Sequence, residues 1–204
     1  ESEKGVFPTF FDLLDILPGV IEESHYSKDT QSDYVGALCT RVKSLTNGIY
    51  GSVFCAEDAL SDAELFDCNV VVDLSRVGSM ETKSLLMGIL VMKLQEYRMC
   101  GSEMNSRLRH VTVLEEAHNL LRKTSAEQSQ EGANLQGKSV EMLANAIAEM
   151  RTYGEGFIIA DQAPGLLDMS VIRNTNTKII LRLPDEEDRK LVGKSAALKE
   201  AQID

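Results

Sequence analysis

Four short apolar segments constrain the fold of this chain more than any other feature of its sequence. They are rich in β-branched residues and apolar almost throughout, which is typical of strands buried on both faces of a sheet. Helical patterns separate them, and strands that alternate with helices indicate a parallel sheet with crossover helices. The segments are residues 69–74, 110–114, 156–160 and 178–183. The sequence therefore predicts an α/β fold, with the sheet as the middle layer of a three-layer sandwich.

Two helical patterns lie between the predicted strands. Residues 80–99 predict one long helix that begins near Ser79, and the stretch before Gly154 predicts another, because apolar side chains recur there at helical spacing. Both helices suit the crossover connections of a parallel sheet. The first has a wide apolar face of Leu85, Leu86, Ile89, Leu90 and Leu94, and the second a stripe of Val140, Leu143, Ile147 and Met150.

The first part of the chain is predicted to be more helical than the rest. Apolar positions within 10–17 indicate a short amphipathic helix that ends at Pro18 and Gly19, and residues 35–45 are a candidate second helix. A polar stretch between Leu121 and Val140 predicts a loop of about 18 residues, a length at which loops tend to be functional or disordered. We expect one domain over residues 1–204, made of a helical lead-in (1–68), the core (69–192) and a tail (193–204).

Composition limits the classes of partner. The chain has 204 residues, of which 43% are hydrophobic, and its net charge is −11. This is enough apolar material for a globular core, and the charge excludes a surface that grips nucleic acid all over, so any such contact must be local. The absence of tryptophan and the 5% aromatic content argue against a carbohydrate cleft or a base-stacking platform.

The cysteines and the apolar runs bear on the compartment. The four cysteines lie far apart, which predicts neither a zinc site nor a disulfide framework and favours a reducing, cytoplasmic environment. The longest central apolar run, residues 85–92, is much shorter than the ~20 residues that a membrane-spanning helix needs. No transmembrane segment and no secretion signal are therefore expected, and the chain is interpreted as part of something longer.

The strongest candidate for chemistry is a pair of carboxylates at a strand end. Glu115 and Glu116 directly follow the predicted strand 110–114. Ligands bind at the carboxyl ends of the strands in an open parallel sheet, and adjacent residues of a strand point to opposite sides. One carboxylate can therefore hold a hydrated Mg²⁺ and the other can orient and deprotonate a water. The competing interpretation is a solvated strand end that leads into a helix whose first turn favours acids.

Two further side chains are candidates for phosphate chemistry. Gln162 follows the next predicted strand and can hydrogen-bond a water or a γ-phosphate without adding charge, unless it only caps a turn before Pro164. Arg151 ends a predicted helix, where the helix dipole alone would favour it, and it is also suited to reach a phosphate in cis or across a subunit interface. Arg173 and Arg182, which flank the last predicted strand, are weaker candidates for the same role.

Other patterns are interpreted as structural. Residues 132–139 formally fit the phosphate-loop pattern, but the polar segment before them cannot be the buried strand that such a loop requires. Residues 193–195 are interpreted as a solvated helix end, and 185–188 as the first turn of a helix after Pro184. The three histidines have no metal-ligand spacing; His118 either orients Glu116 or lies on the surface.

Taken together and in order, these segments resemble the HerA/FtsK superfamily of P-loop ATPases. Residues 114–121 are similar to its Walker B segment, 149–154 to its helix-end segment, 157–164 to its polar sensor strand, and 174–183 to its last core strand. Residues 70–75 resemble the strand that precedes these, and 8–14 resemble segments that follow the phosphate loop in HerA-like and conjugative type IV secretion ATPases. The resemblance runs from about Asn69 to Val192.

The resemblance implies a RecA-like P-loop core and a hexameric, ATP-driven motor that moves double-stranded DNA, or protein in secretion, with a nuclease or secretion partner. Glu115 would hold Mg²⁺, Glu116 would be the catalytic base, Gln162 the sensor, Arg151 the phosphate-contacting arginine at a subunit interface, and Arg182 a nucleotide contact. The first Walker B acid is usually aspartate, whereas here it is glutamate. The phosphate loop and first strand are expected upstream, so this piece alone is expected to be inactive on ATP.

Three interpretations remain open from the sequence: the catalytic part of a motor ATPase, an inactive ATPase-like scaffold, and an unrelated α/β interaction domain with a chance pair of glutamates. The first two predict that Glu115, Glu116, Gln162 and Arg151 converge on one edge of the sheet, and the third predicts that they do not. A strand and phosphate loop elsewhere in the full-length protein would favour the first interpretation over the second.

Overall fold

The computed structural model describes residues 8–56, 60–101, 103–123 and 132–203. The chain divides into two compact units, Glu1–Leu60 and Ser61–Asp204. The division falls within the segment expected as a helical lead-in. Each unit is described by itself.

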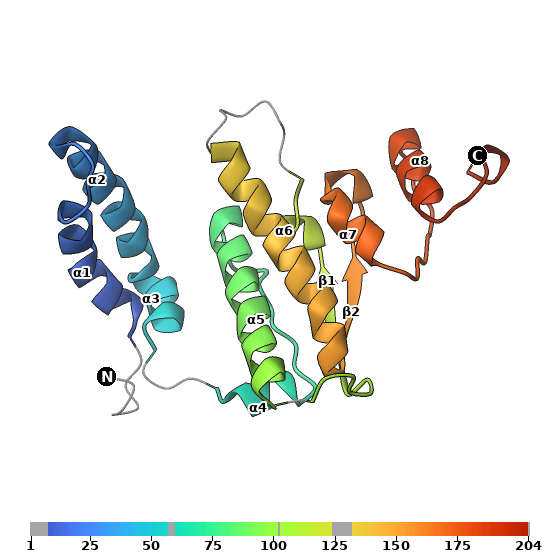
Figure 1. The fold of residues 1–204 in the computed structure, drawn as a ribbon, viewed down its shortest axis with the longest axis horizontal. Coiled ribbons are helices and arrows are strands. Elements are labelled where there is room, and N and C mark those ends of the chain that lie inside the picture. The colour runs from blue at the N-terminus through green and yellow to red at the C-terminus, as the bar shows by residue number, and fades with distance from the viewer. Residues whose placement is uncertain (1–7, 57–59, 102, 124–131, 204) are drawn as a thin grey trace. The chain divides into compact units, whose positions relative to one another are not determined.

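The first unit is helical, as predicted. It contains α1 (Phe10–Glu22), α2 (Lys28–Leu45) and α3 (Gly48–Phe54) (Figure 1). Ser27 caps α2 by accepting a hydrogen bond from the Thr30 amide, which starts the helix well before the predicted residue 35. The ring of Phe10 packs edge-on against that of Phe54, with centroids 5.0 Å apart.

The prediction that the first helix ends at Pro18 is wrong. Pro18 lies inside α1, which continues to Glu22. Proline removes one helical hydrogen bond, but the next turn re-forms, since the Glu23 amide donates to the Gly19 carbonyl over 3.1 Å. Ile21, in this last turn, is the buried residue of the helix, and its burial favours continuing the helix past the proline.

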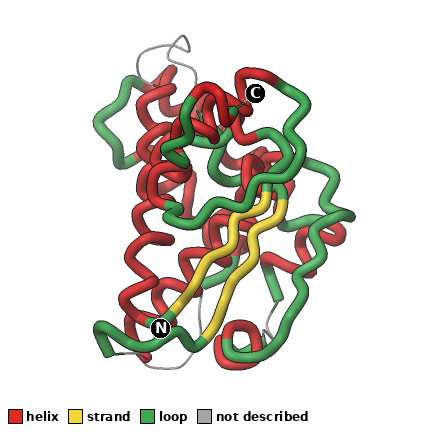
Figure 2. The backbone as a smooth tube through the Cα atoms, turned by 90° about the vertical axis from the view of Figure 1, so that its right-hand side faces the viewer, coloured by secondary structure: helices red, strands yellow, loops and turns green. Residues whose placement is uncertain are grey.

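The second unit places a two-stranded parallel sheet among helices. Its strands are β1 (His110–Glu115) and β2 (Glu155–Ala160), which pair in register from His110↔Glu155 to Glu115↔Ala160 (Figure 2). Both strands and their parallel direction confirm the sequence prediction. The other elements are α4 (Asp62–Phe66), α5 (Met80–Gly101), the 3-10 turns η2 (Ala117–Asn119), η3 (Arg151–Tyr153), η4 (Pro164–Leu166) and η5 (Glu200–Gln202), α6 (Gly132–Met150), α7 (Met169–Asn174) and α8 (Glu186–Ser195).

Helices α5 and α6 build the core on one face of the sheet. The predicted stripe on α6 is confirmed, because all four of its residues are buried. On α5 the predicted buried face is wrong, because the helix is rotated about its axis relative to the prediction. Leu94 is buried, but the other four predicted residues are half-buried or exposed. The helix is apolar over most of its circumference, so hydrophobicity alone does not select a face. Its buried residues are Thr82, Met87, Val91, Leu94 and Arg98.

A buried polar network joins α5 to the amino ends of both strands. The Glu155 carboxylate is fully buried and accepts hydrogen bonds from Arg98 Nε at 2.8 Å and Thr112 Oγ1 at 2.7 Å. His110 Nδ1 lies 2.8 Å from Oε1 of the same carboxylate. Arg98 also donates to the Asp67 carboxylate at 2.6 Å and to the Phe66 carbonyl, which fastens α4 to α5. Every charge in the network therefore has a partner, as burial requires.

Two of the four predicted strands are not strands in the structure. Residues 69–74 and 178–183 have neither helical nor ladder hydrogen bonding. A strand needs a neighbouring backbone to bond to, and among the described residues no segment distant in sequence forms a backbone hydrogen bond with these two. Their apolar side chains are correspondingly exposed: Val71 by 92%, Ile179 by 88% and Leu181 by 83%.

The second face of the sheet also carries exposed apolar side chains. Val111, Val113 and Ile158 are each at least 40% exposed, whereas Leu114 and Ile159 on the alternate positions pack into the core. A parallel pair with helices on one face is common to many α/β arrangements, so the three-layer sandwich stays a prediction. Among the described residues, no helix is both long enough and apolar enough to span a bilayer.

Candidate functional site

The backbone turns sharply at Glu116, directly after β1. Its φ of 50° and ψ of 47° place it in the left-handed region, which costs a residue with a side chain about 1 kcal/mol or more. The conformation is held by the turn that follows, since the Asn119 amide donates to the Glu116 carbonyl over 2.9 Å. The turn points the Glu116 side chain away from the path that a continued strand would give it.

Gln162 meets Glu116 at the carboxyl ends of the two strands. Its side-chain amide Nε2 donates to Glu116 Oε1 at a distance of 2.8 Å. β2 ends at Ala160, so Gln162 follows it by two residues, as Glu116 follows β1 by one. The expected convergence of these two residues is therefore observed. The Glu116 side chain remains 46% exposed, which leaves it open to water and to a ligand.

Asp161 and His118 complete the group, which we call the strand-end cluster (Glu116, His118, Asp161 and Gln162). The Asp161 carboxylate accepts a hydrogen bond from the His118 backbone amide at 2.8 Å, and its Oδ2 lies 2.9 Å from His118 Nδ1. The same imidazole nitrogen lies 3.6 Å from Glu116 Oε2. His118 thus touches both carboxylates, and its side chain is 17% exposed.

The sequence patterns leave the role of His118 open and do not predict that of Asp161. The one signal for Asp161 is its position directly after β2, which matches the position of Glu116 after β1. An acid at the carboxyl end of a buried strand is a candidate wherever its neighbouring strand also ends in acids. The signal for His118 is weak, because its partner Asp161 lies 43 positions away along the chain.

The other three predicted site residues, Glu115, Arg151 and Arg182, lie outside the strand-end cluster. Glu115 is the exposed last residue of β1, next to the strand-end cluster. Arg151 begins η3, which precedes β2, so it lies at the amino ends of the strands, about 17 Å of strand length from the cluster at ~3.3 Å per residue. Within one chain Arg151 therefore does not converge with Glu116, and its expected role across a subunit interface stays a prediction. Arg182 is exposed in the segment 178–183.

The carboxylates described at this edge of the sheet do not form a metal site by themselves. Among the described residues, no group of three or more His, Cys, Asp or Glu side chains is arranged to hold a metal ion. Mg²⁺ commonly uses only one or two protein carboxylates and takes its other ligands from water and substrate phosphates. The exposed carboxylate of Glu115 fits that role in its chemistry.

The phosphate-loop pattern at residues 132–139 is part of a helix. α6 begins at Gly132, so the segment is helical from its first glycine and does not form a strand-to-helix loop. The predicted long loop is accordingly shorter at this end; residues 124–131 lie outside the described residues. The interpretation of 193–195 as a helix end is confirmed, since α8 ends at Ser195, and Asp185 caps that helix.

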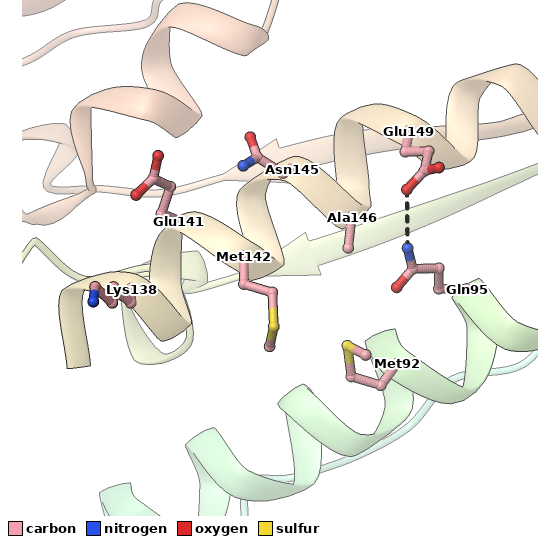
Figure 3. Close-up of a pocket in the computed structure, with 8 residues that line it drawn as sticks. All are labelled: Met92, Gln95, Lys138, Glu141, Met142, Asn145, Ala146 and Glu149. Carbon is pink, nitrogen blue, oxygen red and sulfur yellow. Dashed lines mark hydrogen bonds between the residues drawn. The ribbon is translucent and has the colours of Figure 1, made fainter. Parts of the chain in front are cut away.

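A groove of about 480 Å³ lies between α5 and α6 (Figure 3). Met92 and Met142 face each other across it, and Gln95 Nε2 donates to Glu149 Oε2 at 3.2 Å near one end. None of its lining residues belongs to the strand-end cluster, so the groove and the cluster are separate features.

No family model matches the chain, and neither a curated protein nor a solved structure is significantly similar to it. Function is therefore inferred from the residues and their geometry.

Proposed function

We propose that the chain is part of an ATP-hydrolysing motor domain of the HerA/FtsK type, and that the strand-end cluster is its hydrolytic centre. The hydrogen bond between Gln162 Nε2 and Glu116 Oε1 is the observation that carries the proposal. It joins an acceptor of protons and a neutral hydrogen-bond donor at the carboxyl edge of a parallel sheet, where ligands bind in folds of this class. A chance pair of glutamates would not require Gln162 to meet one of them.

The cluster supports a simple division of roles. Glu116, exposed and held by the turn, orients a water and accepts its proton as the water oxygen bonds to the γ-phosphorus and the bond to the ADP oxygen breaks. When nucleotide is bound, the Gln162 amide would exchange its hydrogen bond to Glu116 for one to the water or to a γ-phosphate oxygen. Glu115 would hold Mg²⁺, which neutralises the charge of the phosphates when it is bound.

The proposal places the remaining phosphate contacts outside the described residues. These residues contain no glycine-rich loop between a buried strand and a helix, and the one sequence match to that pattern is helical. The exposed apolar side chains of residues 178–183 and of the second face of the sheet favour contact with structure outside the described residues. In a hexameric ring, Arg151 would reach the nucleotide of a neighbouring subunit, and Arg182 would contact the nucleotide.

The moved substrate is proposed to be double-stranded DNA, or a protein in secretion. The net charge of −11 restricts DNA contact by this chain to a local segment. Binding of a nuclease or secretion partner is part of the same proposal.

The test compares ATP binding and turnover in the full-length protein. We expect Glu116→Gln to keep Mg²⁺–ATP binding, measured by calorimetry, and to lose turnover by at least about a hundredfold, the size typical for a general base. Glu187→Gln, an exposed glutamate on α8, is the matched control and should leave both unchanged. An unchanged rate in Glu116→Gln would overturn the proposed role, and a wild-type protein that does not turn over ATP would favour the inactive scaffold.

A further inference from the structure

Asp161 joins the segments that follow the two strands. Its carboxylate accepts the His118 backbone amide at Oδ2, 2.8 Å away, and the Ala163 backbone amide at Oδ1, 2.9 Å away. The side chain is only 3% exposed. One buried carboxylate therefore fixes the segment that carries Glu116 to the segment that carries Gln162.

The same carboxylate sets the hydrogen on the imidazole of His118. An ionised carboxylate can only accept hydrogen bonds, so the nitrogen that faces it must donate. His118 Nδ1 lies 2.9 Å from Oδ2 and 3.2 Å from Oδ1 of Asp161. The Glu116 carboxylate lies 3.6 Å from the same nitrogen, which is beyond hydrogen-bond distance, so the tautomer is set by Asp161. In the neutral imidazole the hydrogen is therefore on Nδ1, and Nε2 carries the lone pair.

We propose that Asp161 and His118 act as a positioning pair for Glu116. Glu116 occupies a left-handed conformation, and such a conformation persists only where the surroundings over-determine it. The His118 amide lies two residues beyond Glu116 and is anchored on Asp161, while the His118 ring lies against Glu116 Oε2. The pair holds the Glu116 carboxylate beside Gln162, and its use in hydrolysis rests on the proposed function.

A purely structural role for Asp161 makes a different prediction. The contact from Asp161 to Ala163 spans two residues, as in a common turn in which an aspartate caps the backbone. Such a turn needs no particular hydrogen position on His118 and no effect on Glu116. The tautomer of His118 and the split between kcat and KM therefore separate the two roles.

The first experiment measures the tautomer in the full-length protein. We expect the imidazole ¹⁵N spectrum of His118, recorded at a pH where the ring is neutral, to show the Nδ1–H form as the dominant one. Asp161→Asn should shift the ring toward the Nε2–H form. Asp168→Asn, which removes a comparable carboxylate that caps α7, should leave the His118 signals in place. A wild-type ring in the Nε2–H form would overturn the proposal, and it does so without reference to ATP.

The second experiment measures turnover in the full-length protein. His118→Asn keeps an amide donor near the position of Nδ1, so it should retain most of the rate, whereas His118→Ala should lower kcat about tenfold or more with little change in KM. Equal rates in His118→Ala and wild type would overturn the positioning role. If instead Glu116→Gln leaves turnover intact, the proposed function fails while the tautomer result stands by itself. If Asp161→Asn fails to fold, the wild-type tautomer and the His118 variants still decide.

Discussion

Replacing Glu155 by glutamine should strongly destabilise the second unit. Glu155 is fully buried and faces three donors or donor-capable groups: Arg98, His110 and Thr112. Glutamine keeps the size of the side chain but loses the charge, and its amide nitrogen cannot accept the hydrogen bonds that one of the carboxylate oxygens accepts. The guanidinium of Arg98, itself only 5% exposed, would then keep a single ionic partner, Asp67.

The size of the effect follows from these contacts. Removing one partner of a buried ion pair costs about 3–5 kcal/mol, because the other charge stays buried. Arg98 retains Asp67 at 2.6 Å and the Phe66 carbonyl, so the lower end of this range applies, about 3 kcal/mol. At about 1.4 kcal/mol for each factor of ten, this corresponds to roughly a hundredfold increase in the unfolding equilibrium constant.

The measurement must report on the second unit alone, since the chain divides into two units. Urea-dependent hydrogen exchange, read by mass spectrometry on peptides from β1 and β2, meets this requirement. Glu187→Gln is the control, because an exposed glutamate should change the free energy of unfolding by less than ~0.5 kcal/mol. A loss below ~0.5 kcal/mol in Glu155→Gln would refute the idea that the network depends on its buried charge.

Three further outcomes are expected for the same unit. Leu94→Ala should lower the free energy of unfolding by about 3 kcal/mol, because it leaves a cavity under α5, and the same exchange measurement checks it. Gly154→Ala should destabilise by about 1–3 kcal/mol, since φ is 84° there and a Cβ would lie 2.5 Å from the Arg107 carbonyl oxygen; a lower melting temperature is the readout. The hydrogen bond from the Tyr97 hydroxyl, followed by that from Arg98, lowers the pKa of Asp67 below its ordinary 3.8. The ionised Asp67 carboxylate should therefore stabilise the folded second unit fully above pH 3.8, and this stabilisation should be lost as the pH falls through the folded pKa. An acid titration followed by circular dichroism should show the loss.

Local sequence patterns were enough to predict β1, β2 and the buried face of α6. β1 and β2 follow from short β-branched segments, and the buried stripe of α6 from its helical spacing. Residues 69–74 and 178–183 carry the same kind of pattern and are not strands. Strand formation depends on a partner backbone, and a single segment does not encode the presence of that partner.

Hydrophobic patterns could not predict which charged residues are buried, because burial of a charge also depends on a distant partner. Arg98 is buried on α5 because Glu155 lies opposite, 57 positions away along the chain. The pairing of His118 with Asp161 is likewise non-local. The contact between Glu116 and Gln162 could be predicted, because it follows from two strand ends and the rule that parallel strands end at the same edge.

The two ends of the sheet differ in how their charged side chains are held. At the amino ends, Glu155 and Arg98 are buried and each has several partners, so this network fixes the strands and leaves little room for a ligand. At the carboxyl ends, Glu116 is half exposed and held in an unfavourable backbone conformation. Glycine or asparagine would adopt that conformation at lower cost, so Glu116→Gly should not raise the strain at this turn. Under the proposed function, the left-handed turn at Glu116 is the feature that presents its carboxylate to the ligand.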